Sequence, residues 1–317
     1  MSAAPEAPRD RDSSSSGGPD GRRAGEGTLI LAGTPIGNLG DASDRLRRAL
    51  ATAEVIAAED TRRTRRLAAG LGVELTGRLV AHHEHNEQAT TEQLLGELRS
   101  GATVLVVSDA GMPTVSDPGY RIAAAAAAQG LAVTSLPGPS AVLTALAVSG
   151  LPSDRFAFEG FLPRRTGQRA ARLAELAVER RTMIFYEAPH RIVAMIEALT
   201  EAFGPDRPAA IARELTKLHE EVLRGRLGEL HERIAEDGLR GEIVVVVQGA
   251  PEPAPEQAAD LVGLVEAQVA DGTRLKDAVG RIATDHGVSR RELYEEVLAA
   301  RAREETAQAE DDEDAWD

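Results

Sequence analysis

One stretch, residues 104–119, most constrains what this chain can fold into. It reads VLVVSDAGMPTVSDPG, so the apolar run Val104–Val107 leads directly into a loop with two Gly, two Pro, two Ser and two Asp. The apolar run predicts a buried strand, and the residues after it are turn formers. A helix is predicted next at Tyr120–Gln129, with Asp117 as its cap and Gly130 as its end. The unit is therefore a strand, a polar glycine loop and a helix.

A loop of this kind at the carboxyl end of a strand is a candidate ligand site. In open α/β sheets small ligands bind there, because loops and helix N-termini expose unpaired N–H groups. Gly and Pro also end strands in proteins that bind nothing, but a shorter turn would have been enough for that purpose. We therefore favour a ligand site in this loop.

The length of 317 residues predicts about two domains. In residues 27–149 apolar strands alternate with helices, which predicts a mostly parallel sheet with crossover helices. A second α/β unit is predicted at 150–250. Residues 1–26 have almost nothing to bury and are predicted to be disordered. Residues 251–317 contain a proline-rich linker, two short helices and an acidic tail, and the helix pair fits either a helix-turn-helix or a plain helical hairpin.

The charge of the chain is concentrated at one end. Of the 51 acidic and 36 basic residues, 18 acidic and 7 basic lie from Pro251 onward, which leaves 33 and 29 in residues 1–250. A nearly neutral body has little general affinity for polyanions, so RNA binding would depend on local patches. The absence of Cys excludes a disulfide framework and fits a reducing cytoplasm. No signal peptide or apolar run of about 18 residues is present, so we expect a soluble cytoplasmic protein and no membrane.

Further segments with candidate chemistry follow predicted strands. A second glycine-rich loop lies at 33–40, and a third at Pro137–Ser140. Glu59 and Asp60 end another apolar stretch, where chemistry usually sits in such sheets. The arginines of 62–66 that follow are either a solvated helix face or a patch that contacts phosphates.

Two other clusters receive the simpler interpretation. His82, His83 and His85 lack the spacing of a known metal motif, so no metal is expected. The phenylalanines of 156–161 are predicted to be core residues rather than platforms for stacked bases. The fingerprints GxGxxG, GxxxxGK[ST] and GxSxG are also absent. The residues alone therefore predict a two-lobed α/β ligand-binding protein, with an enzyme favoured.

Six motifs, in order along the chain, resemble one known family. They are TPIGNL at 34–39, EDTR at 59–62, SDAGMPTVSDPG at 108–119, PGPSA at 137–141, YEAPHR at 186–191 and RELTK at 213–217. Together they resemble the bacterial ribosomal RNA small-subunit methyltransferase I family, which belongs to the tetrapyrrole-methylase-like enzymes that use S-adenosylmethionine. The resemblance runs from about Gly27 to Gly249, and the C-terminal helix pair is similar to that family's small terminal domain.

The resemblance implies a fold and an activity. The fold would be the tetrapyrrole methylase fold, with two α/β lobes at 27–149 and 150–250, the cofactor in the cleft between them and a small C-terminal helical domain. The activity would be 2′-O-methylation of a cytidine ribose in the decoding region of small-subunit ribosomal RNA, as naked RNA or in the assembled subunit. The protein would be a homodimer that uses S-adenosylmethionine and no metal. Met112 and Arg226 depart from the family pattern without removing a group that the chemistry needs.

The resemblance also suggests roles for individual residues. Cofactor binding is expected at Pro35, Gly37, Asn38, Ser108, Asp109, Gly111, Pro113, Ser116, Pro137, Gly138 and Ser140. Contacts to RNA phosphates are expected from Arg62, Arg63, Arg65, Arg66, Arg164 and Arg165. The candidates for removing the ribose hydroxyl proton are Glu59, Asp60, Asp109 and Lys217; a carboxylate would need a raised pKa and the lysine a lowered one. Two alternatives stay open: a tetrapyrrole methyltransferase of the same fold, such as one for a corrin precursor, and a non-catalytic binding module.

Overall fold

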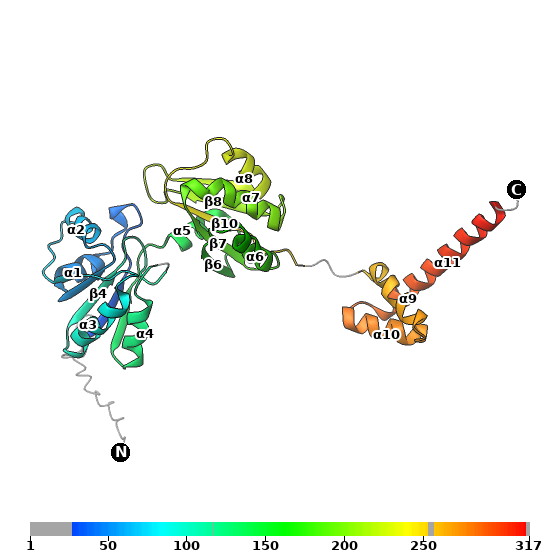
Figure 1. Cartoon of the computed structure of the whole chain (residues 1–317), viewed down its shortest axis with the longest axis horizontal. Helices are drawn as coiled ribbons and strands as arrows, with labels where there is room; N and C mark the ends of the chain where they lie inside the picture. The colour runs from blue at the N-terminus through cyan, green and yellow to red at the C-terminus, as the bar shows by residue number, and fades with distance from the viewer. Residues whose placement is uncertain (1–26, 116, 253–256, 315–317) are drawn as a thin grey trace, which may run out of the picture. The chain divides into compact units, whose positions relative to one another are not determined.

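The chain is described here by a computed structural model that covers residues 27–115, 117–252 and 257–314 (Figure 1). The contacts divide it into two compact units, one ending at Ala250 and one beginning at Pro251. The expectations for residues 1–26, the middle of the linker and the last three residues of the tail lie outside the described residues.

The first sheet is entirely parallel, where a mostly parallel sheet was predicted. Its strands are β1 (Thr28–Ala32), β2 (Val55–Ala58), β3 (Arg78–Ala81), β4 (Thr103–Val107) and β5 (Ala132–Leu136). They lie in the order β3-β2-β4-β1-β5, and each neighbouring pair is parallel. Apart from an initial Thr in β1 and in β4, the central strands are apolar because helices cover both faces of the sheet. All five carboxyl ends therefore lie along one edge, where the polar loops begin.

The helices of residues 27–149 divide between the two sheets. They are α1 (Asp44–Thr52), α2 (Thr61–Gly70), α3 (Glu87–Arg99), α4 (Tyr120–Ala128) and α5 (Ala141–Ser149), with a 3-10 turn η1 at Leu39–Asp41. Leu46 and Leu50 of α1 pack on one face of the first sheet, and Leu94 of α3 and Ile122 of α4 pack on the other. Helix α5 instead packs against the second sheet, which ties the two lobes together.

The second sheet is mixed. Its strands are β6 (Phe156–Phe161), β7 (Thr182–Glu187), β8 (Pro208–Arg213), β9 (Glu221–Arg226) and β10 (Ile243–Val247), in the order β6-β7-β10-β8-β9. Only β6 and β7 are parallel. Helices α6 (Thr166–Leu176), α7 (Ile192–Phe203) and α8 (Leu227–Ile234) form the core on one face, and a 3-10 turn η2 (Pro189–Arg191) precedes α7. Helix α5 covers the opposite face.

A bulge in β6 overturns part of the prediction for the aromatic residues. The register with β7 shifts between Phe158 and Gly160, so Glu159 is the extra residue. Gly160 has φ of +65°, a left-handed conformation that glycine adopts readily. The shift places Phe158 and Phe161 on the same side of the strand, where both rings contact Tyr186. Phe156 and Phe161 are 38% and 58% exposed, so the prediction that they are core residues is wrong for both.

The C-terminal unit is a small helical cluster. It contains a 3-10 turn η3 (Ala258–Leu261) and helices α9 (Val262–Ala270), α10 (Leu275–His286) and α11 (Arg290–Asp314). Val265, Ile282 and Leu293 belong to one apolar core, so the expected helix pair packs with a third helix. Helix α11 has 25 residues, so the second of the two helices expected to be short is long. Across the described part of the chain, every helix is too short or too polar to cross a membrane.

Candidate functional site

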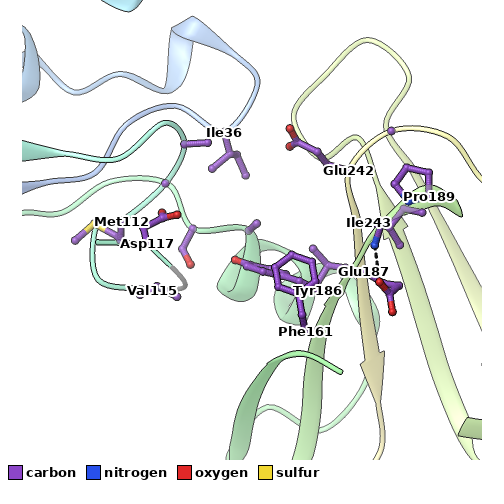
Figure 2. A pocket seen from close by; sticks show the side chains of 17 residues that line it. Ile36, Met112, Val115, Asp117, Phe161, Tyr186, Glu187, Pro189, Glu242 and Ile243 are labelled. Carbon is purple, nitrogen blue, oxygen red and sulfur yellow. Dashed lines mark hydrogen bonds between the residues drawn. The ribbon is translucent and has the colours of Figure 1, made fainter. Parts of the chain in front are cut away.

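Residues from four of the six motifs line one pocket of about 340 Å³ in the first unit. Loops of the first lobe form one wall, and the ends of β7 and β10 form the other (Figure 2). Its lining consists of Ile36, Ala110, Gly111, Met112, Val115, Asp117, Ser140, Ala141, Phe161, Tyr186, Glu187, Ala188, Pro189, Gly241, Glu242, Ile243 and Val244. Asp117 and Glu242 contribute carboxyl groups to this lining and Phe161 and Tyr186 contribute aromatic rings, whereas the carboxyl group of Glu187 is fully buried in the wall. None of the lining residues is basic.

The loops after β1, β4 and β5 fit together because their glycines allow close approach. Thr34 and Gly111 form a bridge in which each N–H donates to the other's carbonyl, at 2.9 and 3.1 Å. A Cβ atom on Gly138 would lie 2.8 Å from three backbone atoms of Gly33. Backbone atoms cannot yield as a flexible side chain can, so these two positions require glycine. The loops after β1 and β5 therefore cross directly beside the pocket.

The loop after β1 also contacts the second lobe. A Cβ atom on Gly37 would lie 2.5 Å from Cγ of Lys217 and 2.9 Å from Oγ1 of Thr216. In the same RELTK segment, Glu214 and Thr216 have positive φ values of 51° and 66°. Residues other than glycine adopt this conformation at a cost, and such strain is concentrated at functional sites. The TPIGNL and RELTK motifs are thus in contact, although residues 40–212 separate them in the sequence.

Asp117 faces the pocket and is not the cap that its sequence position predicted. The cap of α4 is Gly119, whose N–H donates to Oε1 of Glu87 at 3.0 Å. The other carboxylate oxygen of Glu87 pairs with Arg121 at 3.0 Å. Because α3 supplies this anion from elsewhere in the chain, Asp117 is left to line the cavity (Figure 2).

Burial raises the pKa of Asp117 from 3.8 to about 7. The negative charges of Glu59 and Asp109 act in the same direction, and a hydrogen bond with the Ser108 side chain acts against them. A carboxyl group that titrates near neutral pH can accept or release a proton under physiological conditions. Sequence reasoning missed this residue, although it lies within the SDAGMPTVSDPG motif, because helix capping explained its position.

Three of the four predicted proton acceptors come from one cluster at the ends of β2 and β4. The N–H of Asp109 donates to Oε2 of Glu59, and the N–H of Asp60 donates to Oδ1 of Asp109, both at 3.1 Å. Burial raises the pKa values of Glu59 and Asp109. Asp60 is the cap of α2, and the hydrogen bond from the N–H of Arg62 lowers its pKa. None of the three lines the pocket, but the charges of Glu59 and Asp109 act on Asp117, which does.

Lys217 forms ion pairs on the other side of the site. Its Nζ lies 2.8 Å from Oε1 of Glu214 and 3.3 Å from Oε2 of Glu242. Burial acts to lower the pKa of Lys217, but the hydrogen bonds and charges of these two carboxylates outweigh it and the pKa is raised. A base needs the opposite shift. This arrangement favours a positioning role toward Glu242, which lines the pocket.

The end of β7 supplies the aromatic and acidic part of the wall. The side chain of Glu187 is fully buried, accepts the N–H of Ala188 at 2.8 Å and pairs with Arg191 at 3.4 Å. Burial raises the pKa of Tyr186 to about 12, so its hydroxyl stays protonated. Its ring meets that of Phe161 edge to face, with centroids 5.6 Å apart. Tyr186 and Glu187 lie in the YEAPHR motif, but no role was assigned to either from the sequence.

The remaining predicted cofactor residues take different positions. Gly111 and Ser140 line the pocket, and Ser108 is buried behind it with its hydroxyl donating to the carbonyl of Gly111 at 3.1 Å. Ser116 lies outside the described residues. The others shape the surrounding loops without lining the cavity: Pro35, Gly37, Asn38, Asp109, Pro113, Pro137 and Gly138.

The predicted RNA contacts are exposed. On α2, Arg62 pairs with Asp60 at 3.4 Å and Arg63 with Asp109 at 3.3 Å, and Arg65 and Arg66 point to solvent. Arg164 and Arg165 are exposed before α6, and Arg164 lines a second cavity.

The histidine-rich segment forms local contacts. His82 is buried beside Thr90, with Nδ1 2.7 Å from the threonine hydroxyl, and the rings of His83 and His85 meet edge to face. No group of His, Cys, Asp and Glu that could hold a metal ion occurs in the part of the chain that the structure describes.

Comparisons with known proteins agree on one family. The family described as Tetrapyrrole (Corrin/Porphyrin) Methylases matches residues 28–231. A "Ribosomal RNA small subunit methyltransferase I" of Mycobacterium tuberculosis is 53% identical over 276 residues, which cover 87% of this chain and 96% of the relative. The protein of that name from Micromonospora olivasterospora is 49% identical over 284 residues, with 88% and 89% covered.

Solved structures of low sequence identity share the fold. The uroporphyrin-III-C-methyltransferase from Thermus thermophilus aligns with a TM-score of 0.51 and 24% identity, covering 70% of this chain and 94% of the other. The methyltransferase CobJ aligns with a TM-score of 0.52 and 22% identity, with 73% and 98% covered. The expected fold is confirmed. The chain belongs to the tetrapyrrole (corrin/porphyrin) methylase family, and within it to the methyltransferases named ribosomal RNA small subunit methyltransferase I.

Proposed function

We propose that this chain transfers a methyl group from S-adenosylmethionine to the 2′-oxygen of a cytidine in the decoding region of small-subunit ribosomal RNA. The pocket between the lobes carries this proposal, because it joins the glycine loops after β1, β4 and β5 to an acidic and aromatic wall. The names of the relatives support ribosomal RNA of the small subunit as the substrate.

The residues of the pocket suit a cationic ligand of this size. A cavity of about 340 Å³ lies within the range of small-molecule sites, roughly 300–1,000 Å³. The exposed carboxyl group of Glu242 favours positive charge, and the rings of Tyr186 and Phe161 can interact with a cation through their faces. Gly111 and Ser140 offer backbone groups and a hydroxyl to polar ends of the ligand. When bound, S-adenosylmethionine supplies a methyl group that its sulfonium charge already activates for in-line displacement.

We propose Asp117 as the proton acceptor for the ribose hydroxyl. The acceptor must be ionised at working pH and still basic enough to take a proton, which favours a pKa near 7. Asp117 meets this condition and faces the pocket, whereas Asp60 has a lowered pKa and Lys217 a raised one. Glu59 and Asp109 then act indirectly on proton transfer, because their negative charges help to raise the pKa of Asp117.

The arginines of α2 test the RNA part of the proposal. Changing Arg62, Arg63, Arg65 and Arg66 to Ala is expected to raise KM for small ribosomal subunits at least about tenfold, since each lost phosphate contact weakens binding and its salt dependence. The dissociation constant for S-adenosylmethionine should stay unchanged, because none of the four lines the pocket. Kinetics with purified subunits and calorimetric titration measure the two quantities. Equal KM values in the variant and the unchanged chain would contradict the patch assignment.

We also propose that the chain works as a homodimer in the cytoplasm. The edge strand β5 is largely exposed, and Tyr120 and Leu143, which flank it in sequence, are 72% and 54% exposed. Open strand edges and large exposed apolar side chains are features that a partner subunit would cover. Sedimentation of the purified protein should give twice the mass of 33.6 kDa. A monomer at micromolar concentration would refute this part alone.

One experiment tests the proposed reaction directly. Small subunits from cells that lack the gene are incubated with the protein and S-adenosylmethionine labelled in the methyl group, and ribose methylation is mapped along the RNA by resistance to alkaline hydrolysis. We expect one labelled cytidine in the decoding region. Label on a base, label elsewhere in the RNA, or binding of S-adenosylmethionine without transfer to RNA would overturn the proposal.

A further inference from the structure

A second cavity adjoins the pocket and has a different chemical character. Its volume is about 370 Å³, and its lining is Phe161, Leu162, Pro163, Arg164, Ala188, His190 and Arg191. Phe161 and Ala188 line both cavities, so the ring of Phe161 stands at their boundary. The first cavity has acidic lining residues and no basic ones, whereas the second has two arginines and a histidine and no acidic residue. The two spaces therefore favour ligands of opposite charge.

The ring of Phe161 is held in an exposed position by the bulge in β6. Tyr186 supports it from one side, and Phe158 supports Tyr186 in turn with ring centroids 4.9 Å apart. The bulged residue Glu159 pairs with Arg172 of α6 at 2.6 Å, which fixes the bulge to the next helix. Bulges beside functional sites commonly redirect a side chain. Here the result is a rigid aromatic face that is 58% exposed instead of buried.

The two arginines that line this cavity differ in whether another residue of the chain already binds them. Arg191 is engaged, because it donates to the carbonyl of Leu162 at 3.0 Å and pairs with the buried Glu187. Arg164 is exposed, and among the described residues no carboxylate pairs with it. A cavity with an aromatic side, one free guanidinium and an apolar floor of Leu162 and Pro163 matches what single-stranded nucleic acid needs. Bases stack on aromatic rings and arginine contacts the phosphates.

We infer that this second cavity binds one unstacked nucleotide of RNA, with its base against Phe161 and its phosphate toward Arg164 and His190. The inference rests on the proposed function and adds to it the place where the acceptor nucleotide enters. A nucleotide held there meets the pocket of the methyl donor at Phe161, so its ribose can approach the first cavity while its phosphate remains beside the basic side chains of the second. The size of the cavity restricts the occupant to about one nucleotide.

Binding of a short RNA tests the inference without any methyl transfer. The probe is a ten-nucleotide single-stranded RNA that contains a fluorescent base analogue, titrated with the full chain in the absence of S-adenosylmethionine. Phe161→Leu is expected to weaken binding about tenfold or more, because leucine keeps apolar volume but cannot stack, and Phe161→Trp should retain it. Phe156→Leu is the matched control, since Phe156 is a partly exposed phenylalanine at the other end of the same strand and lines neither cavity.

Arg164 allows a second test of the inference, because it does not line the pocket of the methyl donor. Arg164→Ala should weaken the short RNA and lower the slope of log affinity against log salt by about one, while the affinity for S-adenosylmethionine stays constant. Arg233→Ala, which removes an exposed arginine that lines neither cavity, should change neither value.

The outcomes separate this inference from the proposed function. If the unchanged chain methylates its ribosomal substrate but Phe161→Leu and Arg164→Ala bind the short RNA as well as it does, the nucleotide cavity is refuted and the proposed function stands. If no transfer occurs but both variants lose affinity for the short RNA, the cavity stands and the proposed function fails. Failure of the unchanged chain to bind the short RNA would also overturn the inference.

Discussion

Replacing Asp117 by Asn is expected to lower the rate of methyl transfer by about 10²- to 10⁴-fold, the range typical of a lost general base. Asn has nearly the same shape but cannot accept the proton from the ribose hydroxyl. The unchanged enzyme should gain rate about tenfold per pH unit below pH 7 and level off above it, because the pKa of Asp117 is about 7 and only the ionised form acts. Single-turnover rates from pH 5.5 to 8.5 measure both effects.

The thermal stability of Asp117→Asn distinguishes a loss of catalysis from misfolding. The pKa of Asp117 is raised in the folded protein above its ordinary 3.8, so between these two values the unfolded chain has released a proton that the folded chain keeps. The contribution of this group to the free energy of unfolding therefore falls as the pH rises from about 4 to 7 and is constant above. Asp117→Asn removes this penalty and should unfold at an equal or higher temperature near pH 7.5. A variant that loses both activity and thermal stability would contradict the assignment.

A neighbouring variant tests the cause of the raised pKa. The charge of Glu59 raises the pKa of Asp117, so Glu59→Gln should move the break in the pH profile of the rate to lower pH and leave the plateau largely intact. An unchanged break in Glu59→Gln, together with a normal rate for Asp117→Asn, would mean that another group accepts the proton.

Gly138→Ala is expected to reduce the affinity for S-adenosylmethionine at least about tenfold and to destabilise the fold by about 1–3 kcal/mol, the usual cost of overpacking. The new Cβ would lie 2.8 Å from the Cα, C and O atoms of Gly33. Because all three are backbone atoms, the loops after β1 and β5 must separate. Small displacements of this kind cost affinity and rate when they move the groups that hold a ligand. Calorimetric titration and thermal unfolding measure the two effects.

A matched glycine controls for the general effect of adding a methyl group. Gly96 lies inside α3, and no atom lies within 4 Å of a Cβ built there. Gly96→Ala should therefore stabilise the chain slightly through better helix propensity and leave ligand affinity unchanged. Gly138→Ala behaving like Gly96→Ala would show that the crossing of the two loops does not shape the pocket.

Local sequence predicted most of the first lobe. The parallel strands could be recognised in the sequence as near-continuous apolar runs such as Val104–Val107, because helices bury both faces of the sheet. The loops after β1, β4 and β5 could be recognised by their glycines, which close backbone approach and positive φ values require there. The position of these loops at one edge followed from the parallel order, and Gly111 and Ser140 do line the pocket.

Contacts between distant segments decided what the sequence left open or assigned wrongly. Asp117 had the position of a helix cap, but the cap is Gly119, whose N–H donates to Glu87 of another helix. Phe161 was predicted to lie in the core, but the bulge at Glu159 turned its side chain outward. Lys217 was a candidate base, but Glu214 and Glu242 raised its pKa.

The sequence by itself determined the elements, their order and the loops that need glycine, because these depend on backbone conformation and on the periodicity of apolar residues. Only the tertiary structure decided which side chains face the pocket and with what charge. A pKa and an exposed fraction are set by neighbours that come from other parts of the chain. Asp117 in the loop between β4 and α4 and Tyr186 near the end of β7 are far apart in sequence and become parts of one site only when the two lobes pack.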